Sequence, residues 1–173
     1  MVTGKDTGYS GTGRPSARRM ESGPVAVIEC IEEIPCNPCE GACPVGAIQV
    51  GQPLTNLPKL SEHKCTGCGI CIAACPGLAI FNIDLSRGDE TAIVAMPYEY
   101  LPLPKEGAAV TVTDRDGQPV GRGLVHSVKR MEKYDNTAIV SVEVKKELAD
   151  IVRSIKEGED GTEETNLPLR RDY

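Results

Sequence analysis

Large aromatic side chains are scarce in this sequence, which has no Trp, one Phe and five Tyr among 173 residues. An ordinary hydrophobic core would use several of them, because each buries a large apolar area. The sequence also lacks a run of about 18 apolar residues that could span a bilayer, and a basic segment followed by an apolar one at its start. It therefore predicts a cytoplasmic protein without membrane insertion, whose core is filled by something other than large side chains.

Positive charge is also in deficit, since 19 Lys and Arg stand against 25 Asp and Glu and give a formal net charge of −6. Nucleic acids and anionic membranes are bound through basic surfaces, so we expect neither as a partner. An acidic surface suits a basic face of another protein. The chain is short for a large catalytic scaffold, and no Ser/His/Asp set or carboxylate pair forms a recognisable motif. We predict no catalytic residues and no enzymatic activity of its own.

Cysteine, in contrast, is abundant, with eight residues between positions 30 and 75. Clustered Cys in a protein without an export signal favour metal binding over disulfides. Three of them recur 32 positions later, so that Cys36, Cys39 and Cys43 correspond to Cys68, Cys71 and Cys75. Cys30 and Cys65 are 35 residues apart, which means that the first copy has three extra residues. Duplication of one small unit is the simplest interpretation.

The second copy has the pattern C-x2-C-x2-C-x3-C-P over residues 65–76. Gaps of two residues let three thiolates converge on one 4Fe-4S cube, and Gly67 and Gly69 let backbone amides approach the sulfur atoms. Zinc sites also use C-x2-C pairs, but they need neither a third Cys two residues on nor the C-x3-C-P ending. A radical-SAM enzyme would have C-x3-C-x2-C on a much larger barrel. The motif therefore predicts iron–sulfur clusters.

With this motif, residues 25–83 resemble the bacterial two-cluster ferredoxin family. The resemblance implies two [4Fe-4S] clusters, one-electron transfer, and a last Cys in each motif that serves the other cluster. Two sets of four ligands follow from it. Set 1, for the first cluster, contains Cys30, Cys36, Cys39 and Cys75. Set 2, for the second cluster, contains Cys43, Cys65, Cys68 and Cys71.

Cys30 departs from the family pattern, because five residues separate it from Cys36 where the family has two. Two interpretations are open. In the first, the loop bulges and Cys30 still binds iron. In the second, Cys30 is a buried thiol at the end of a strand, and the first cluster is incomplete or has three irons. We favour ligation, because Cys30 ends a strand candidate as Cys65 does.

Changes of composition divide the chain into five segments. These are a flexible arm (1–23), the two-cluster ferredoxin-like domain (24–84), a Pro-rich linker (85–107), a small β module with a helix (108–157) and an acidic tail (158–173). Apolar alternation predicts strands over 109–113, 124–128 and 138–144, with a tight turn at Asp116-Gly117. The spacing of Leu148, Ile151, Val152 and Ile155 predicts a C-terminal helix. The expected fold class is α+β, in which a pseudo-twofold ferredoxin-like domain precedes a small antiparallel β module.

The added segments bear on function, because a free carrier of the ferredoxin type needs only about 55 to 80 residues. The excess favours a subunit of a larger oxidoreductase. More loosely, residues 34–40 together with the β module resemble small iron–sulfur subunits of flavin-dependent amino-acid or amine dehydrogenases, which implies a flavoprotein or another oxidoreductase subunit as partner. Two alternatives remain: a free soluble carrier, and a non-redox interaction module in which the clusters act as structural staples.

Overall fold

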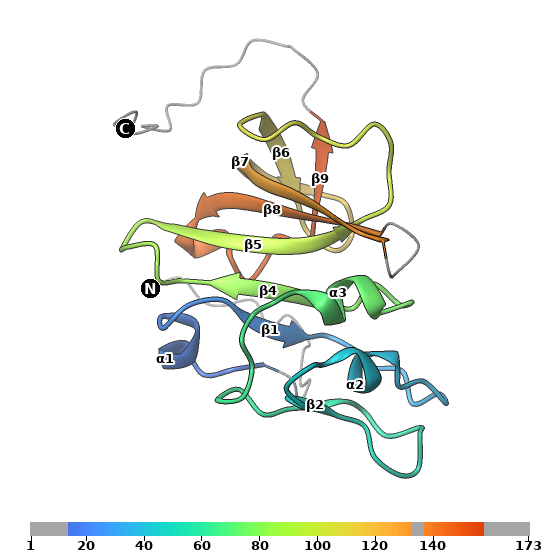
Figure 1. Ribbon diagram of the computed structural model, residues 1–173. Coiled ribbons are helices and arrows are strands. Elements are labelled where there is room, and N and C mark those ends of the chain that lie inside the picture. The colour runs from blue at the N-terminus through green and yellow to red at the C-terminus, as the bar shows by residue number, and fades with distance from the viewer. Residues whose placement is uncertain (1–13, 133–136, 158–173) are drawn as a thin grey trace.

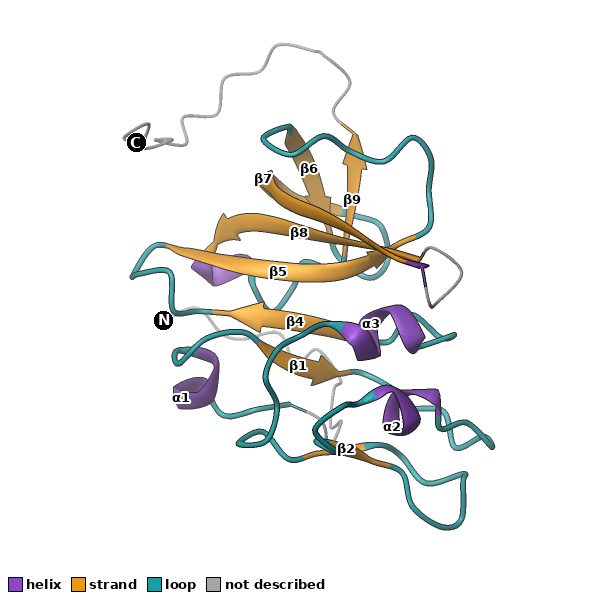
Figure 2. Ribbon diagram, viewed as in Figure 1, coloured by secondary structure: helices purple, strands orange, loops and turns teal. Residues whose placement is uncertain are grey.

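The computed structural model describes residues 14–132 and 137–157 (Figure 1). Its helices are short: α1 (Ala17–Met20), α2 (Pro38–Ala42), α3 (Ile70–Ala74) and the 3-10 helix η2 (Lys146–Leu148). Its strands are β1 (Val25–Ile28), β2 (Ile48–Gln49), β3 (Lys59–Leu60), β4 (Ile80–Asp84), β5 (Thr91–Tyr98), β6 (Ala109–Thr113), β7 (Pro119–Met131), β8 (Thr137–Lys145) and β9 (Ser154–Glu157). Strands dominate the described part (Figure 2), and none of its helices is long and apolar enough to cross a bilayer.

Seven strands form one antiparallel sheet in the order β1-β4-β5-β8-β7-β6-β9, and β2 pairs separately with β3. The inner strand β4 pairs with β1 on one edge and with β5 on the other. In Figure 1, the cysteine-rich segment lies on one side of β4 and the C-terminal strands on the other. Both parts of the chain therefore share a single continuous sheet.

The sheet separates two cores, because side chains alternate between its faces. On β8, Val140 and Val142 pack into the larger core, which is built by the C-terminal strands together with one face of β1 and β4. Ile139, next to Val140 in the chain, belongs to the second core. That core consists of Ala, Val, Ile and Cys side chains and surrounds the cysteines. Aromatic side chains are not part of it among the described residues.

The duplicated unit is visible in the local structure. Helices α2 and α3 occupy equivalent positions in the two copies, 32 residues apart, and each has five residues. Each ends where a Cys-Pro sequence begins, because the residue before Pro is biased towards extended backbone. Cys43 and Cys75 are both extended there, with ψ 109° in each.

The three strands predicted in the C-terminal part are confirmed as β6, β7 and β8. The turn at Asp116-Gly117 is also confirmed. Gly117 has φ 76°, and the Asp114 carboxylate accepts the backbone N–H of Asp116 and of Gln118. A short carboxylate side chain and a left-handed Gly are the usual components of such a turn.

The Pro-rich linker predicted over 85–107 is wrong for residues 91–98, which form β5 in the middle of the sheet. Pro97 is compatible with this position for a specific reason. β4 pairs with β5 only as far as Ala95, so the missing N–H of Pro97 deprives no β4 residue of a partner.

The C-terminal helix predicted from Leu148 to Ile155 is wrong as well. Only η2 is helical there, and Ser154–Glu157 forms β9, which pairs with β6. Ile151 is 40% exposed, whereas Val152 and Ile155 are buried, so the apolar spacing reflects a turn that leads into an edge strand. The predicted acidic tail, 158–173, lies outside the described residues.

The flexible arm predicted over 1–23 is wrong for residues 14–23. These include α1, which begins after Ser16 and buries Met20 at 3% exposure. The Met20 carbonyl accepts the N–H of Leu85, so the segment is held against the end of β4. Residues 1–13 of that arm lie outside the described part of the chain.

Ion pairs connect the two edges of the sheet. Glu29 directly follows β1, and Arg153 directly precedes β9, the strand at the opposite edge. Arg153 donates from Nε (2.7 Å) and Nη2 (2.5 Å) to Glu29 Oε1, while Arg115 in the β6–β7 turn pairs with Oε2. Both guanidinium groups also lie over the Phe81 ring. The sheet is thus curled, and its edges are held by side chains rather than by backbone hydrogen bonds.

Candidate metal centres

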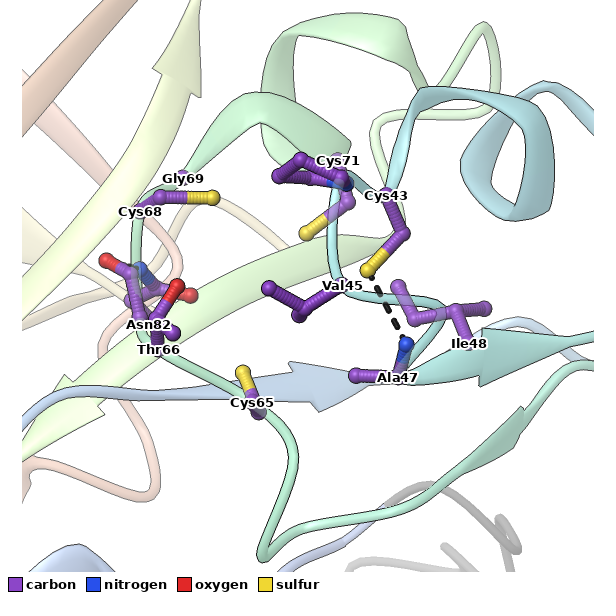
Figure 3. A pocket seen from close by; sticks show the side chains of 12 residues that line it. Cys43, Val45, Ala47, Ile48, Cys65, Thr66, Cys68, Gly69, Cys71 and Asn82 are labelled. Carbon is purple, nitrogen blue, oxygen red and sulfur yellow. Dashed lines mark hydrogen bonds between the residues drawn. The ribbon is translucent and has the colours of Figure 1, made fainter.

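The four cysteines of set 2 surround one cavity (Figure 3). Cys43 ends α2, Cys71 lies in α3, and Cys65 and Cys68 come from the loop that precedes α3. Their sulfur atoms face the central space, which measures about 300 Å³ including its opening to solvent. The structure therefore brings together the four residues that the ferredoxin resemblance assigns to set 2.

The electrostatic interactions among the cysteine thiols show the same grouping of set 2. Burial raises the pKa of the Cys71 thiol to about 12, with the nearby Cys65, Cys68 and Cys43 contributing. Several thiolates in one buried space repel each other and favour their protonated forms. A cationic group in that space reverses this preference, so its binding is coupled to the release of protons.

The four cysteines of set 1 also lie together. The pKa of Cys36 is raised by burial and then by the nearby Cys75 and Cys30. Burial raises the pKa of Cys39 to about 11, with Cys75 and Cys36 contributing. Cys30 is therefore beside its set despite the five-residue gap, and the enlarged loop does not carry it away.

Backbone amides donate to the cysteine sulfurs at equivalent positions of the two copies. The N–H of Ala47 donates to Cys43 Sγ at 3.2 Å, and the N–H of Ala79 donates to Cys75 Sγ at 3.4 Å. The N–H of Ala26, in β1, donates to Cys65 Sγ at 3.5 Å. Such bonds stabilise negative charge on sulfur, which is how a protein tunes a thiolate-bound metal centre.

The turn after each Cys-Pro requires a left-handed residue, and the two copies supply it differently. The first has Gly46 (φ 58°), and the second has Leu78 (φ 49°) at the equivalent position. Left-handed backbone costs about 1–2 kcal/mol for a residue with a Cβ. Leu78 is 40% exposed, so its side chain recovers little of that cost through burial.

We therefore expect Leu78→Gly to raise the free energy of unfolding by about 0.5–1 kcal/mol, after subtraction of the backbone entropy of Gly in the unfolded chain. Gly46→Ala is the matched control and should lower it by about 1 kcal/mol, because no atom lies within 4 Å of the added Cβ and only backbone strain changes. Urea denaturation of both variants measures the difference. A loss of stability in Leu78→Gly would show that side-chain contacts outweigh the strain.

The set 2 loop is held at Gly67, in a position that excludes a side chain. Gly67 has φ 66°, and a Cβ built on it would lie 2.4 Å from the Pro24 carbonyl oxygen. Its own carbonyl accepts Asn82 Nδ2 at 2.7 Å. Asn82 is buried and lines the cavity, and its Oδ1 has no hydrogen-bond partner among the described residues. A cradle of close backbone, N–H donors and four soft thiolates fits a thiolate-bound iron–sulfur group.

Arg19 is a site residue that the sequence pattern does not mark, because it lies in the segment predicted to be a flexible arm. Its guanidinium donates to the carbonyls of Cys65 (2.7 Å), Glu62 (3.0 Å), Pro24 (3.1 Å) and Gly23 (3.0 Å). It therefore joins the end of α1 to the set 2 loop. The partners are backbone carbonyls up to 46 residues away, and no motif marks such a contact.

Comparison with protein families matches residues 58–81 to the 4Fe-4S binding domain. This stretch contains the whole second motif, from Cys65 to Cys75. It also contains Gly67 and helix α3, whereas Pro24, Cys43 and Asn82, which complete the cradle around set 2, lie outside it. No solved structure matches the chain.

Curated relatives are similar over short stretches. A stretch of 47 residues is 47% identical to one component of an ion-translocating oxidoreductase complex from Methanosarcina acetivorans, and it covers 27% of this chain and 17% of that protein. Another of 38 residues is 47% identical to one component of a Na(+)-translocating ferredoxin:NAD(+) oxidoreductase complex from Acetobacterium woodii, covering 22% and 11%. A third, of 54 residues, is 39% identical to the polyferredoxin-like subunit of an aliphatic sulfonate oxidoreductase from Pyrococcus furiosus, covering 31% and 28%.

The chain thus spans less than a third of the length of each of these relatives. What they share with it is a short stretch rather than a whole architecture. A 4Fe-4S domain accounts for the clustered cysteine thiols, for the second core without aromatic side chains among the described residues, and for the backbone amides that donate to cysteine sulfur atoms. Residues 58–81 therefore match the 4Fe-4S binding domain, which supports at least one [4Fe-4S] cluster, and short stretches of the chain are similar to subunits of oxidoreductase complexes.

Proposed function

We propose that the protein relays single electrons through two [4Fe-4S] clusters, held by set 1 and set 2, as a subunit of a larger oxidoreductase. The observation that supports this best is the interleaving of the two sets. Cys43 follows α2 of the first copy but lies with set 2, and Cys75 follows α3 of the second copy but lies with set 1. When bound, each cluster supplies a centre that takes up and gives back one electron.

The chain's own residues would place and tune these centres. Helices α2 and α3 pack against each other, so the sets they carry are close neighbours, as a relay requires. Cys39 and Cys71 are buried in the same core, so one thiol of each set is shielded from water. Amide donors at Cys43, Cys65 and Cys75 stabilise charge on sulfur.

Single metal ions fit this arrangement less well. Among residues 14–132 and 137–157, no three His, Cys, Asp or Glu side chains come together closely enough to hold one ion. A tetrahedral zinc site needs its thiolates gathered around one point, at about 2.3 Å from the metal. Here the four thiols of set 2 line one cavity together, and the C-x2-C-x2-C-x3-C-P spacing of residues 65–76 is typical of a [4Fe-4S] cluster.

Partner choice follows from charge and from the relatives. With about −2 added by each four-thiolate cluster, the formal charge of −6 becomes about −10. A strongly anionic subunit is attracted to a basic face. Because the relatives named above are subunits of oxidoreductase complexes, we propose another oxidoreductase subunit, such as a flavoprotein, as partner. We assign the protein no catalytic residue, and the chemistry on a substrate belongs to that partner.

Iron counting and spectroscopy test this proposal. We expect about eight irons per chain and visible absorption that a low-potential reductant bleaches reversibly. Cys30→Ser should reduce the count, because the first cluster becomes incomplete, and Cys68→Ser is the matching change in set 2. A count of about four that Cys30→Ser leaves unchanged would contradict the two-cluster proposal. Clusters that never reduce would favour the structural staple instead.

A further inference from the structure

The loop 31–35 between Cys30 and Cys36 is where the two copies of the repeat differ most. The second copy joins Cys65 to Cys68 through two residues, and Gly67 among them packs against Pro24. The first copy uses five residues, and all five are exposed. The insertion therefore adds surface next to set 1 rather than filling space inside the protein.

This surface exposes large apolar side chains. Ile31 is 68% exposed and Ile34 is 53% exposed, although burial of an Ile side chain is favourable. Leu54, 37% exposed, lies on the adjacent segment, and its carbonyl accepts the N–H of Cys36 at 3.2 Å. We define Ile31, Ile34 and Leu54 as the Ile31 patch. It flanks Cys36, a half-buried member of set 1.

The patch is anchored at both ends of the loop. Before Cys30, Glu29 is held by Arg153 and Arg115, and its N–H donates to the Ala79 carbonyl at 2.7 Å. After the loop, Cys36 is bonded to Leu54. A loop fixed in this way presents its apolar side chains at little entropic cost on binding, which favours association with another protein.

The chain segment that carries the patch has ionisable side chains of one sign only. Residues 29–58 contain four Glu and no Asp, Lys or Arg. Glu29 is paired with Arg153 and Arg115, whereas Glu32 and Glu33 are exposed and have no basic partner among the described residues. A second copy of this chain would bring the same charges together, and like charges at an interface are unfavourable. A basic rim on the other surface is favoured.

We propose that the Ile31 patch is the docking surface for a redox partner protein whose contact face has an apolar centre ringed by Lys and Arg. One electron then leaves the centre at set 1 beside Cys36 and reduces a one-electron acceptor in that partner, with no proton transferred. This inference rests on the proposed function, since it requires a reducible cluster at set 1.

Ferric cytochrome c, with an apolar haem edge ringed by Lys, is the probe for this surface. Reduced protein, freed of excess reductant, is mixed with it by stopped flow, and haem reduction is followed. We expect Ile31→Ser/Ile34→Ser to lower the second-order rate constant about tenfold. Reduction of the small ion hexaammineruthenium(III), which needs no apolar contact, should stay within about twofold. Leu101→Ser, at a residue 78% exposed beyond the end of β5, is the matched control and should change neither rate.

The double variant Glu32→Gln/Glu33→Gln tests the contribution of the acidic side chains independently. It also tests the docking proposal if the Ile variant loses iron. We expect its cytochrome c rate to be lower at low salt and to depend less on ionic strength. An unchanged cytochrome c rate in the iron-loaded Ile variant would overturn the proposal, as would an unchanged salt dependence in the Glu variant. A dimer that dissociates on the Ile substitutions would also overturn it. In each of these cases, the proposed function would still be supported if the wild type reduces the ruthenium ion. If the wild type does not reduce the ruthenium ion, the proposed electron transfer is contradicted as well.

Discussion

Replacing Glu29 by Gln is expected to lower the free energy of unfolding by about 3–5 kcal/mol. Glu29 and Arg153 are each 7% exposed at their side chains, so the substitution leaves a buried guanidinium without its counter-charge. Gln preserves the shape of Glu, which isolates the effect of charge. Urea denaturation at pH 7, extrapolated to water for wild type and variant, measures the difference.

Asp150→Asn is the matched control for this prediction. It makes the same change of carboxylate to amide in the Arg14–Asp150 pair, whose side chains are 43% and 55% exposed. Exposed pairs of this kind contribute about 0–1 kcal/mol, so little change is expected. Equal effects of the two substitutions would show that the pair between the sheet edges contributes no more than a surface pair.

The stabilisation by Glu29 should also depend on pH. Burial by itself raises the pKa of Glu29, but Arg153 and Arg115 outweigh burial and hold the pKa below its ordinary value of 4.5. A group whose pKa is lower in the folded state stabilises that state fully above the unfolded value and loses the effect as the pH falls through the folded value. The gap between wild type and Glu29→Gln should therefore shrink below pH 4.5. A gap that stays the same at pH 7 and at pH 3 would contradict this account.

Gly67→Ala is expected to lower the free energy of unfolding by about 2–5 kcal/mol and to reduce the iron content of set 2. The added Cβ would lie 2.4 Å from the Pro24 carbonyl oxygen and 2.7 Å from its carbon. Two costs add up: about 1–2 kcal/mol for left-handed backbone and about 1–3 kcal/mol for overpacking against main chain. Because Gly67 lies between Cys65 and Cys68, any shift that relieves the contact moves the cysteines of set 2.

Gly117→Ala separates these two costs. Gly117 has a similar φ of 76°, but a Cβ there meets no atom within 4 Å. It should cost about 1 kcal/mol and leave the iron content unchanged. If Gly67→Ala were no worse than Gly117→Ala in stability and in iron, the contact with Pro24 would not define the position of the loop.

The motif and the repeat of 32 could be recognised from the spacing of the cysteines along the chain. Their grouping into two sets was predictable only through the resemblance to two-cluster ferredoxins, in which the last Cys of each motif serves the other cluster. The contacts around the cysteines follow no motif in the sequence. Glu29 and Arg153 are 124 residues apart, and Arg19 binds carbonyls of several segments, so only the assembled sheet brings these groups together.

The errors beyond residue 84 have a common cause, which is that strand pairing is non-local. Pro97 suggested an irregular crossing, yet β5 has β4 on one side only as far as Ala95, and a Pro fits beyond that point. Val152 and Ile155 suggested a helical face, but β9 is defined by pairing with β6, more than 40 residues earlier. A local pattern of apolar residues contains neither fact.

The pairing of β4 with β5 has a kinetic consequence. A carrier that swings between electron donor and acceptor needs a hinge between its redox unit and the part that anchors it. Here β4 lies between the cysteine-rich part and the C-terminal strands, and its backbone hydrogen bonds to β1 and β5 leave no flexible segment that could act as a hinge. For the relay proposed above, tunnelling distances would then be set by how partners approach the protein rather than by internal motion. Its turnover would be governed by the encounter with partners and their release.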